Sequence, residues 1–240
     1  MDLIDCRKAW AGQAKTAHAE ELERSKIFTE DLKAVGTDAS NIKNVKDQTR
    51  GVCELAIFKD PKSIRFIREQ SQLICRKAVL QNADVLEFVR TQTPALCLTA
   101  VRKDGNALRF VNSQNQGICL AAVQQNGCAL QYVLDQTREI CLAAVNSDAD
   151  AFLQVKKQSQ RVCLAALRQD PFNFRLIRKK SAAICMAAVK QDGRLLCNVR
   201  GPSEKMCIAA VKQNIAAIKY VPPAIFKEVR LRRKAEKDSK

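Results

Sequence analysis

The sequence predicts an all-α fold, an α-solenoid of nine 22-residue repeats with two helices each and a helical cap at either end. The first observation is a cysteine at 53, 75, 97, 119, 141, 163, 185 and 207, always 22 residues after the last. A fixed period of this length is typical of repeat architectures, in which each unit packs on its neighbours. An alanine follows each of these cysteines after three residues, and an Asp or Asn follows after seven.

These repeats divide the chain into three parts. Numbering each repeat from its cysteine as position 1, one earlier unit has Asp31 in that place, so the repeats extend over 31–228. Residues 1–30 lack the period, but their spaced apolar residues and the absence of proline favour a capping helix. Residues 229–240 form a basic C-terminal tail. No signal peptide or membrane span is expected, because the apolar runs are too short.

The first helix of each repeat is predicted from position 20 to position 7 of the next unit. Position 19 is mostly Ser or Thr, and Pro94 follows Thr93. A hydroxyl residue followed by proline is typical of a helix start, because the side chain accepts a free backbone N–H and proline has none to leave unpaired. Apolar residues run nearly all round this helix, which indicates packing on several sides. The hydroxyl residues at position 19 are Thr49, Ser71, Thr93, Thr137, Ser159, Ser181 and Ser203.

A second helix is predicted from position 9 to about position 17. Position 8 is always Asp or Asn, and Asp60 and Asp170 are followed by proline, as at a capped helix start. Positions 11, 12 and 15 form its buried stripe. Glutamine recurs at position 18, and we expect these carboxamides to bond backbone groups of the turns in a stacked ladder. The glutamines are Gln48, Gln70, Gln92, Gln114, Gln136 and Gln158.

The periodic cysteines predict a ladder of buried free thiols. Equivalent residues of packed helices lie about 8–10 Å apart, whereas a disulfide needs Cα atoms within about 7 Å. The same separation argues against a shared zinc ion. The sequence therefore predicts no metal and no cofactor, and buried thiols favour a reducing compartment, either the cytoplasm or a host cytoplasm into which the protein is delivered.

The chain is strongly basic, with 41 Lys and Arg against 25 Asp and Glu and a net charge of +16. Residues 1–30 carry −1 and 227–240 carry +4, so most of the excess lies in the repeats. Such a body favours an anionic partner, namely an acidic protein, nucleic acid or a membrane surface. Surface charge that serves only solubility is the alternative interpretation.

The candidate site is a basic stripe at positions 13 and 16 of the second helix, one turn apart. Its members are Lys43, Lys46, Arg65, Arg68, Arg90, Arg109, Lys156, Arg175, Arg178, Arg200 and Lys219. Leu134 and Leu153 occupy the same positions, and apolar residues on a polar face suggest a protein-docking patch, with local repacking as the alternative. Glu87, Gln131 and Cys197 also interrupt the stripe.

Aromatic residues at position 14 raise the question of base stacking. They are Phe66, Phe88, Phe110, Tyr132 and Tyr220. On a helical wheel position 14 lies on the opposite flank from position 16, so we expect the rings to seal contacts between repeats.

Catalysis is not predicted. The sequence has no glycine-rich phosphate loop, and its one histidine, His18, lies outside the repeats. Cys6, Cys128 and Cys197 lie outside the ladder, but no base can be assigned to activate them as nucleophiles.

Three strings of the repeats are AVRKDGNALRFV (100–111), AAVQQNGCALQYV (121–133) and AAVKQN (209–214). They resemble the repeats of the family called domain of unknown function four-one-one-six, which forms tandem arrays in bacteria, protists and large viruses. The resemblance covers residues 31–228 and is strongest from 75 to 221. It implies a helical repeat fold, assigns no activity or binding residue, and suggests an effector or a viral protein that contacts host proteins.

These observations predict a non-enzymatic scaffold that docks an acidic protein partner on the second-helix surface. The alternative is binding of RNA or DNA through the same basic stripe. The two differ in their dependence on salt and on Leu134 and Leu153, because phosphate contacts weaken steeply with salt, whereas a protein interface depends on particular apolar positions.

Overall fold

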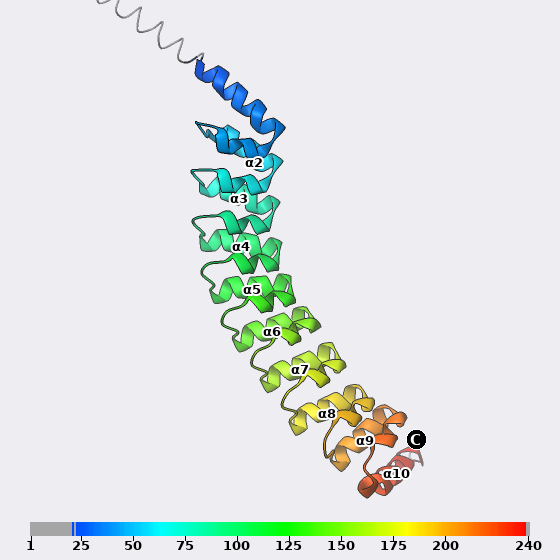
Figure 1. The fold of residues 1–240 in the computed structure, drawn as a ribbon. Coiled ribbons are helices and arrows are strands. Elements are labelled where there is room, and N and C mark those ends of the chain that lie inside the picture. The colour runs from blue at the N-terminus through cyan, green and yellow to red at the C-terminus, as the bar shows by residue number, and fades with distance from the viewer. Residues whose placement is uncertain (1–20, 22, 239–240) are drawn as a thin grey trace, which may run out of the picture. The chain divides into compact units, whose positions relative to one another are not determined.

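The computed structural model describes residues 21 and 23–238, with side chains up to Leu231, and it confirms an all-α solenoid of repeated helix pairs. The described residues contain no strand. The chain divides into two units, Met1–Ala100 and Val101–Lys240, and the elements of each follow one another in chain order (Figure 1). Of the predicted N-terminal cap, residues 1–20 and 22 lie outside the described part. The remainder belongs to a helix over 23–37, which ends at position 7 of the first repeat.

Each repeat alternates an α-helix with a short 3-10 helix. The first unit contains η1 (Ala39–Asn44), α2 (Arg50–Lys59), η2 (Pro61–Phe66), α3 (Gln72–Gln81), η3 (Ala83–Phe88) and the start of α4 (Pro94–Lys103). The second contains η4 (Gly105–Phe110), α5 (Gln116–Gln125), η5 (Gly127–Tyr132), α6 (Arg138–Ser147), η6 (Ala149–Gln154), α7 (Gln160–Gln169), η7 (Pro171–Leu176), α8 (Ala182–Gln191), η8 (Gly193–Asn198), α9 (Glu204–Gln213), η9 (Ile215–Tyr220) and α10 (Pro223–Asp238).

The α-helices begin and end where the sequence predicts, at positions 20 and 7. Their N-caps are also as predicted in all but one case. The hydroxyl of Ser71 accepts a hydrogen bond from the backbone N–H of Ile74, for example, and this satisfies one N–H of the first turn. The cap predicted at Thr49 is wrong, because its hydroxyl makes no cap hydrogen bond and is buried without a partner.

The second helices are shorter and tighter than predicted, because each is a six-residue 3-10 helix that ends at position 14 and not near 17. All nine are capped by the predicted Asp or Asn; Asp60 Oδ1, for instance, accepts from the N–H of Lys62 at 2.9 Å. The N–H of position 15 bonds the carbonyl of position 12, as in Val133 to Leu130 at 3.2 Å. This i−3 bond closes the 3-10 helix, and the extended backbone that follows leads to the next repeat.

The core consists of the α-helix positions 22, 1, 4 and 5 and the predicted positions 11, 12 and 15. The α-helices are less enclosed than their sequences suggest, because positions 2 and 3, such as Leu142 and Ala143, are half-buried. At position 6, Phe58 and Leu80 of the first unit are exposed by 73% and 51%. One face of the α-helices is therefore open to solvent.

Glycine at position 9 marks a close approach between repeats. A Cβ on Gly127 would lie 2.6 Å from the carbonyl oxygen of Ala144 in the next α-helix. Where Pro171 occupies this position, α7 and α8 contact each other less extensively than α5 and α6. Proline at position 9 therefore accompanies looser packing of the neighbouring α-helices.

The predicted glutamine ladder is confirmed. Gln136 Nε2 donates to the carbonyls of Leu130 (3.1 Å) in its own repeat and Gln154 (3.0 Å) in the next, and its Oε1 accepts from the N–H of Lys156 (2.9 Å). Gln48 makes the same three bonds in the first unit. Each glutamine thus joins two consecutive repeats through groups that a tight turn leaves unpaired.

The ladder thiols are free and buried, as predicted. Several point at the glutamine of position 18, with Cys119 Sγ lying 3.6 Å from Gln114 Oε1. Burial raises the pKa of these thiols, because a low-dielectric surrounding disfavours the thiolate.

At the C-terminal end, α10 packs on α9, and its Val229 is buried. This helix continues past residue 228, where the sequence analysis ends the repeats and begins the basic tail. The last repeat is therefore covered by a helix with no 3-10 partner among the described residues.

Candidate binding surface

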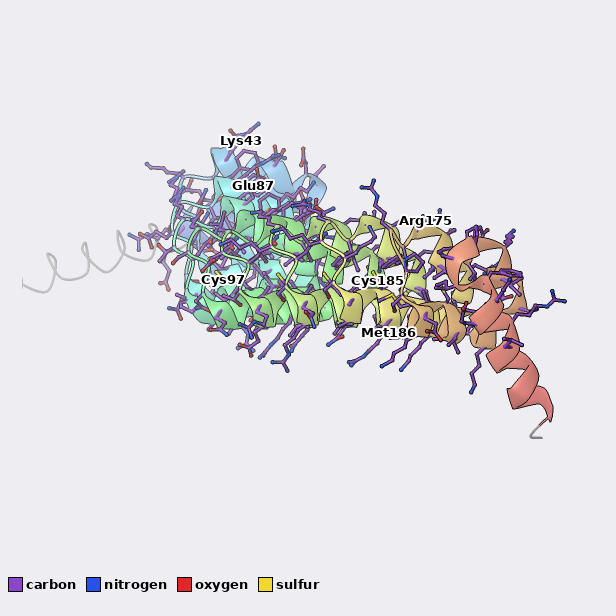
Figure 2. All side chains as sticks on the ribbon, turned by 90° about the horizontal axis from the view of Figure 1, so that it is seen from below. Lys43, Glu87, Cys97, Arg175, Cys185 and Met186 are labelled. Atoms are coloured by element: carbon purple, nitrogen blue, oxygen red, sulfur yellow. The ribbon has the colours of Figure 1, made fainter. Side chains whose placement is uncertain are left out.

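All eleven residues of the basic stripe are exposed. Position 13 lies within each 3-10 helix, whereas position 16 lies in the turn that follows, because the helix ends earlier than predicted. In the first unit Lys43 and Glu87 project on the same side, away from Cys97, and in the second unit Arg175 and Met186 lie on opposite edges (Figure 2). The 3-10 helices and their turns therefore form a surface distinct from the open α-helix face.

Several position-16 arginines are engaged by the backbone of the preceding repeat. Arg68 donates from Nη1 to the carbonyl of Lys46 (2.9 Å) and from Nη2 to that of Val45 (2.6 Å). Arg90 reaches the carbonyl of Arg68 at 2.6 Å, and Arg178 reaches that of Lys156 at 3.5 Å. These guanidinium groups stabilise the inter-repeat turns, so part of their bonding capacity is already used.

The position-13 cations cover aromatic rings at position 14. The guanidinium carbon of Arg65 lies 4.7 Å from the ring centroid of Phe66 and 5.8 Å from that of Phe88. Arg109 lies 4.5 Å from Phe110 in the same way. The rings are half-buried beneath these cation–π contacts, so stacking a nucleic-acid base on them would require the cation to move away.

Large apolar side chains are exposed on three consecutive 3-10 segments of the second unit. Leu134 and Leu153 are exposed by 75% and 61%, at the positions where most other repeats carry cations. Phe172 and Leu176 of η7 are also exposed, by 53% and 40%. The apolar surface of the η5–η7 segments therefore extends beyond the two leucines. Sequence reasoning missed Phe172, although no other repeat has an aromatic residue at position 10.

Few acidic side chains neutralise the positive charge of the stripe, because most recurring carboxylates cap 3-10 helices. Asp192 accepts from the backbone N–H of Arg194 and also pairs with its guanidinium at 3.0 Å. The Arg194 side chain holds the pKa of Asp192 below its ordinary value. The positive charge of the stripe is thus largely uncompensated within the described repeats.

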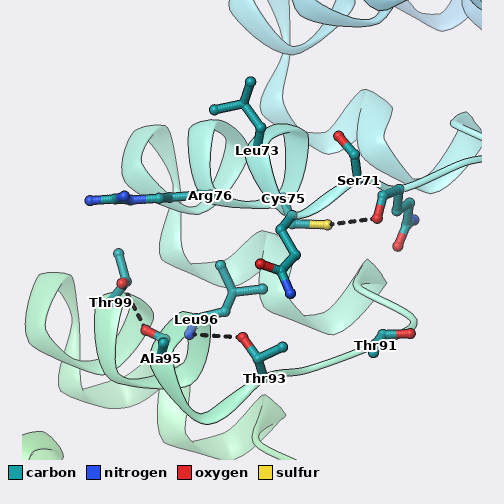
Figure 3. Close-up of a pocket in the computed structure, with 11 residues that line it drawn as sticks. Ser71, Leu73, Cys75, Arg76, Thr91, Thr93, Ala95, Leu96 and Thr99 are labelled. Atoms are coloured by element: carbon teal, nitrogen blue, oxygen red, sulfur yellow. Dashed lines mark hydrogen bonds between the residues drawn. The ribbon is translucent and has the colours of Figure 1, made fainter.

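An open pocket of about 890 Å³ lies in the first unit between α3 and the beginning of α4 (Figure 3). Two of its hydroxyls are engaged within the fold: Thr93 accepts from the N–H of Leu96 at 3.3 Å, and Thr99 donates to the carbonyl of Ala95 at 2.9 Å. Burial raises the pKa of the Cys75 thiol, and Arg76 points away from the pocket. The lining includes no carboxylate or histidine to act as a general base.

The cysteines outside the ladder differ in environment. Cys128 Sγ lies 3.3 Å from Asp148 Oδ2, and its pKa is raised, first by burial and then by this carboxylate. Cys197 is exposed, and Cys6 and His18 lie outside the described residues. Within the part of the chain that the structure describes, no group of three or more His, Cys, Asp or Glu side chains could hold a metal ion. No described helix is long and apolar enough to cross a membrane.

Comparison with known proteins finds a family match over one segment of the repeats. Residues 95–136 match the model of a domain of unknown function (DUF4116). The matched segment includes α5, η5 and their flanking turns, so it contains the helix pair and ladder contacts that recur through the chain. The resemblance seen in the sequence is therefore confirmed over this segment. No curated protein and no solved structure matches the chain.

Proposed function

We propose that this protein is a non-enzymatic scaffold that docks an acidic protein partner on the 3-10 helix surface of its second unit. The observation that carries the proposal is the exposure of Leu134, Leu153, Phe172 and Leu176 on consecutive segments that also bear Lys156 and Arg175. Apolar anchors surrounded by polar or charged groups are typical of protein interfaces. Positive charge around them favours a partner with negative charge on the facing surface.

Contacts within the repeats favour a protein over RNA or DNA. Arg178 is held by a backbone carbonyl of its own chain, and Arg109 covers Phe110, so fewer donors and rings remain for phosphates and bases. Solvent-exposed leucine adds little to binding of a phosphate backbone, which depends on charge. We also propose that the protein acts in a reducing compartment, because its buried thiols are unpaired.

The test is affinity capture from nuclease-treated lysate with quantitative mass spectrometry. The wild type is compared with a Leu134→Ser, Leu153→Ser double variant. The control is a Gln131→Ser, Gln154→Ser variant, whose exposed residues lie in η5 and η6, close in sequence to the two leucines. We expect a defined set of acidic proteins to bind the wild type and the control and to be lost with the leucines. Truncation of interface anchors typically weakens binding by about tenfold or more per residue.

Two results would contradict this function. If capture is unchanged by the leucine substitutions, the apolar face is not the interface. If proteins are captured from untreated lysate but not from nuclease-treated lysate, and a labelled single strand binds with an affinity that falls steeply with salt, the basic stripe binds nucleic acid instead.

A further inference from the structure

The glutamine ladder ends after the sixth repeat, because position 18 is Lys180 in the seventh, Pro202 in the eighth and Ala224 in the ninth. In five repeats the Oε1 of this glutamine accepts the backbone N–H of position 16 in the next unit, as Gln158 does for Arg178 at 2.9 Å. Lysine has no acceptor. Its Nζ donates to the carbonyl of Ile177 at 2.8 Å, and the N–H of Arg200 has no partner among the described residues.

An open pocket of about 480 Å³ lies where the ladder ends, lined by Arg175, Lys180, Arg200 and the chain from Cys197 to Val199. Its volume falls in the range of small-ligand sites, about 300–1,000 Å³. The replacement of glutamine by lysine therefore does two things at one place: it removes the acceptor for a backbone N–H and adds a third cation.

Carboxylates do not neutralise this pocket. Residues 151–203 contain eleven Lys or Arg, two Asp and no Glu. Both aspartates are engaged elsewhere, since Asp170 caps η7 and Asp192 caps η8 and pairs with Arg194. No ion pair involves Arg175, Lys180 or Arg200 within the described chain.

The repeats are also more loosely packed here. The contact between η6 and η7 is much smaller than the contact between η5 and η6. The contact between η7 and α8 is likewise smaller than the equivalent contact between η8 and α9. Pro171 at position 9 and the bulky Phe174, fully buried at position 12, accompany this wider spacing. The space lies beside the missing glutamine, so an anionic ligand could take the position of its carboxamide oxygen.

We propose that this pocket binds a phosphate monoester group. Such a group carries about −1.5 to −2 charges at neutral pH and three terminal oxygens. These oxygens match the three cationic side chains, and one of them can accept the N–H of Arg200. A phosphodiester carries a single charge and two such oxygens, so it would offset less of the positive charge of the three side chains. The pocket does not depend on the apolar docking surface and would remain a site if no protein partner existed.

The experiment measures binding of inorganic phosphate by calorimetry and thermal shift, in chloride buffer of constant ionic strength. Lys180→Gln removes the cation and introduces the acceptor that Gln158 and its equivalents provide in earlier repeats, so it should fold at least as well as the wild type. Lys179→Gln is the matched control, because it makes the same charge change at an adjacent exposed residue that does not line the pocket. We expect Lys180→Gln and Arg175→Gln to weaken phosphate binding about tenfold each, as for loss of a charged hydrogen bond, and Lys179→Gln to leave it within about twofold.

The proposal is overturned if phosphate has no effect beyond that of chloride, or if Lys179→Gln weakens binding as much as Lys180→Gln. It is also overturned if an oligonucleotide without a terminal phosphate displaces phosphate as effectively as phosphoserine does. A phosphoserine peptide that binds more tightly than inorganic phosphate, with the gain lost in Lys180→Gln, would identify a phosphorylated protein as the source. Equal or weaker peptide binding would indicate a small phosphorylated molecule.

Discussion

Gln136 Oε1 accepts a hydrogen bond from the backbone N–H of Lys156 at 2.9 Å, twenty residues further along the chain. Equivalent bonds recur in the first unit between Gln48 and Arg68. A single side chain therefore joins two consecutive repeats by hydrogen bonds, in addition to their apolar packing. The recurring glutamine is therefore a structural part of the repeat.

Replacement of Gln136 by alanine should lower the free energy of unfolding by about 1–3 kcal/mol, because three backbone groups lose their partner. Urea denaturation followed by circular dichroism measures this change. Gln124→Ala is the control, since that side chain is exposed on α5 and makes no hydrogen bond in the structure, and it should change stability by less than about 0.5 kcal/mol. Equal effects of the two variants would show that the ladder adds no stability.

A methyl group on Gly127 should also destabilise the protein, by about 1–3 kcal/mol, because its Cβ would lie 2.6 Å from the backbone oxygen of Ala144. Gly117→Ala is the matched control. That glycine lies in the first turn of α5, is exposed, and has only Asn115 Oδ1 within reach of a Cβ, at 3.4 Å. Alanine there should stabilise the helix by up to about 1 kcal/mol. Thermal unfolding of the pair would show opposite shifts, and a stable Gly127→Ala variant would mean that neighbouring repeats separate without penalty.

Substitution of Arg68 tests whether a position-16 arginine stabilises the folded repeats. Arg68→Ala removes two hydrogen bonds to backbone carbonyls of the preceding repeat and should cost about 1 kcal/mol, at the low end for a charged donor because the side chain is exposed. Lys46→Ala, at the same position one repeat earlier, removes a lysine whose side chain makes no such bond and should be nearly neutral. Chemical denaturation of both variants is the measurement, and similar losses would show that the carbonyl contacts of Arg68 contribute nothing.

The α-helices and both sets of caps could be predicted from sequence because their signals are local. Asp60 followed by proline marks the start of η2 without reference to any other repeat. The 3-10 geometry of that helix could not be predicted, since the choice between an i−3 and an i−4 bond depends on how the next repeat packs. Exposure of Leu134 followed from its position on the stripe, whereas the carbonyl contacts of Arg68 join residues 22 and 23 apart in sequence and required the structure.

Lys180 illustrates a second limit of prediction from sequence. Its departure from glutamine is visible in the sequence, but the consequence depends on what the replaced side chain bonds in the other repeats. Only the contacts of Gln158 and its equivalents reveal that Arg200 loses an acceptor. The sequence marks where a repeat differs from its neighbours, and the structure shows which interaction is lost there.

Alkaline pH should destabilise the protein. The pKa of all eight ladder thiols is raised in the folded chain, chiefly by burial. An unfolded cysteine ionises near pH 8.5. The stabilisation from these thiols is therefore fully present below that pH. It declines as the pH rises, because the unfolded chain then releases protons that the folded chain retains. Urea midpoints measured under reducing conditions between pH 7 and pH 9.5 should fall steadily.

A second comparison tests whether the ladder cysteines, and not other groups that ionise at alkaline pH, cause this fall in stability. A Cys141→Ala, Cys163→Ala double variant removes two of the eight thiols and should reduce the loss of stability between the two pH values by roughly a quarter. Cys197→Ala is the control, because this cysteine is exposed and lies outside the ladder, and the pH dependence should be unchanged. A flat profile in the wild type would show that the buried thiols ionise as readily in the folded chain as in the unfolded one, which would contradict their burial beneath the glutamine ladder.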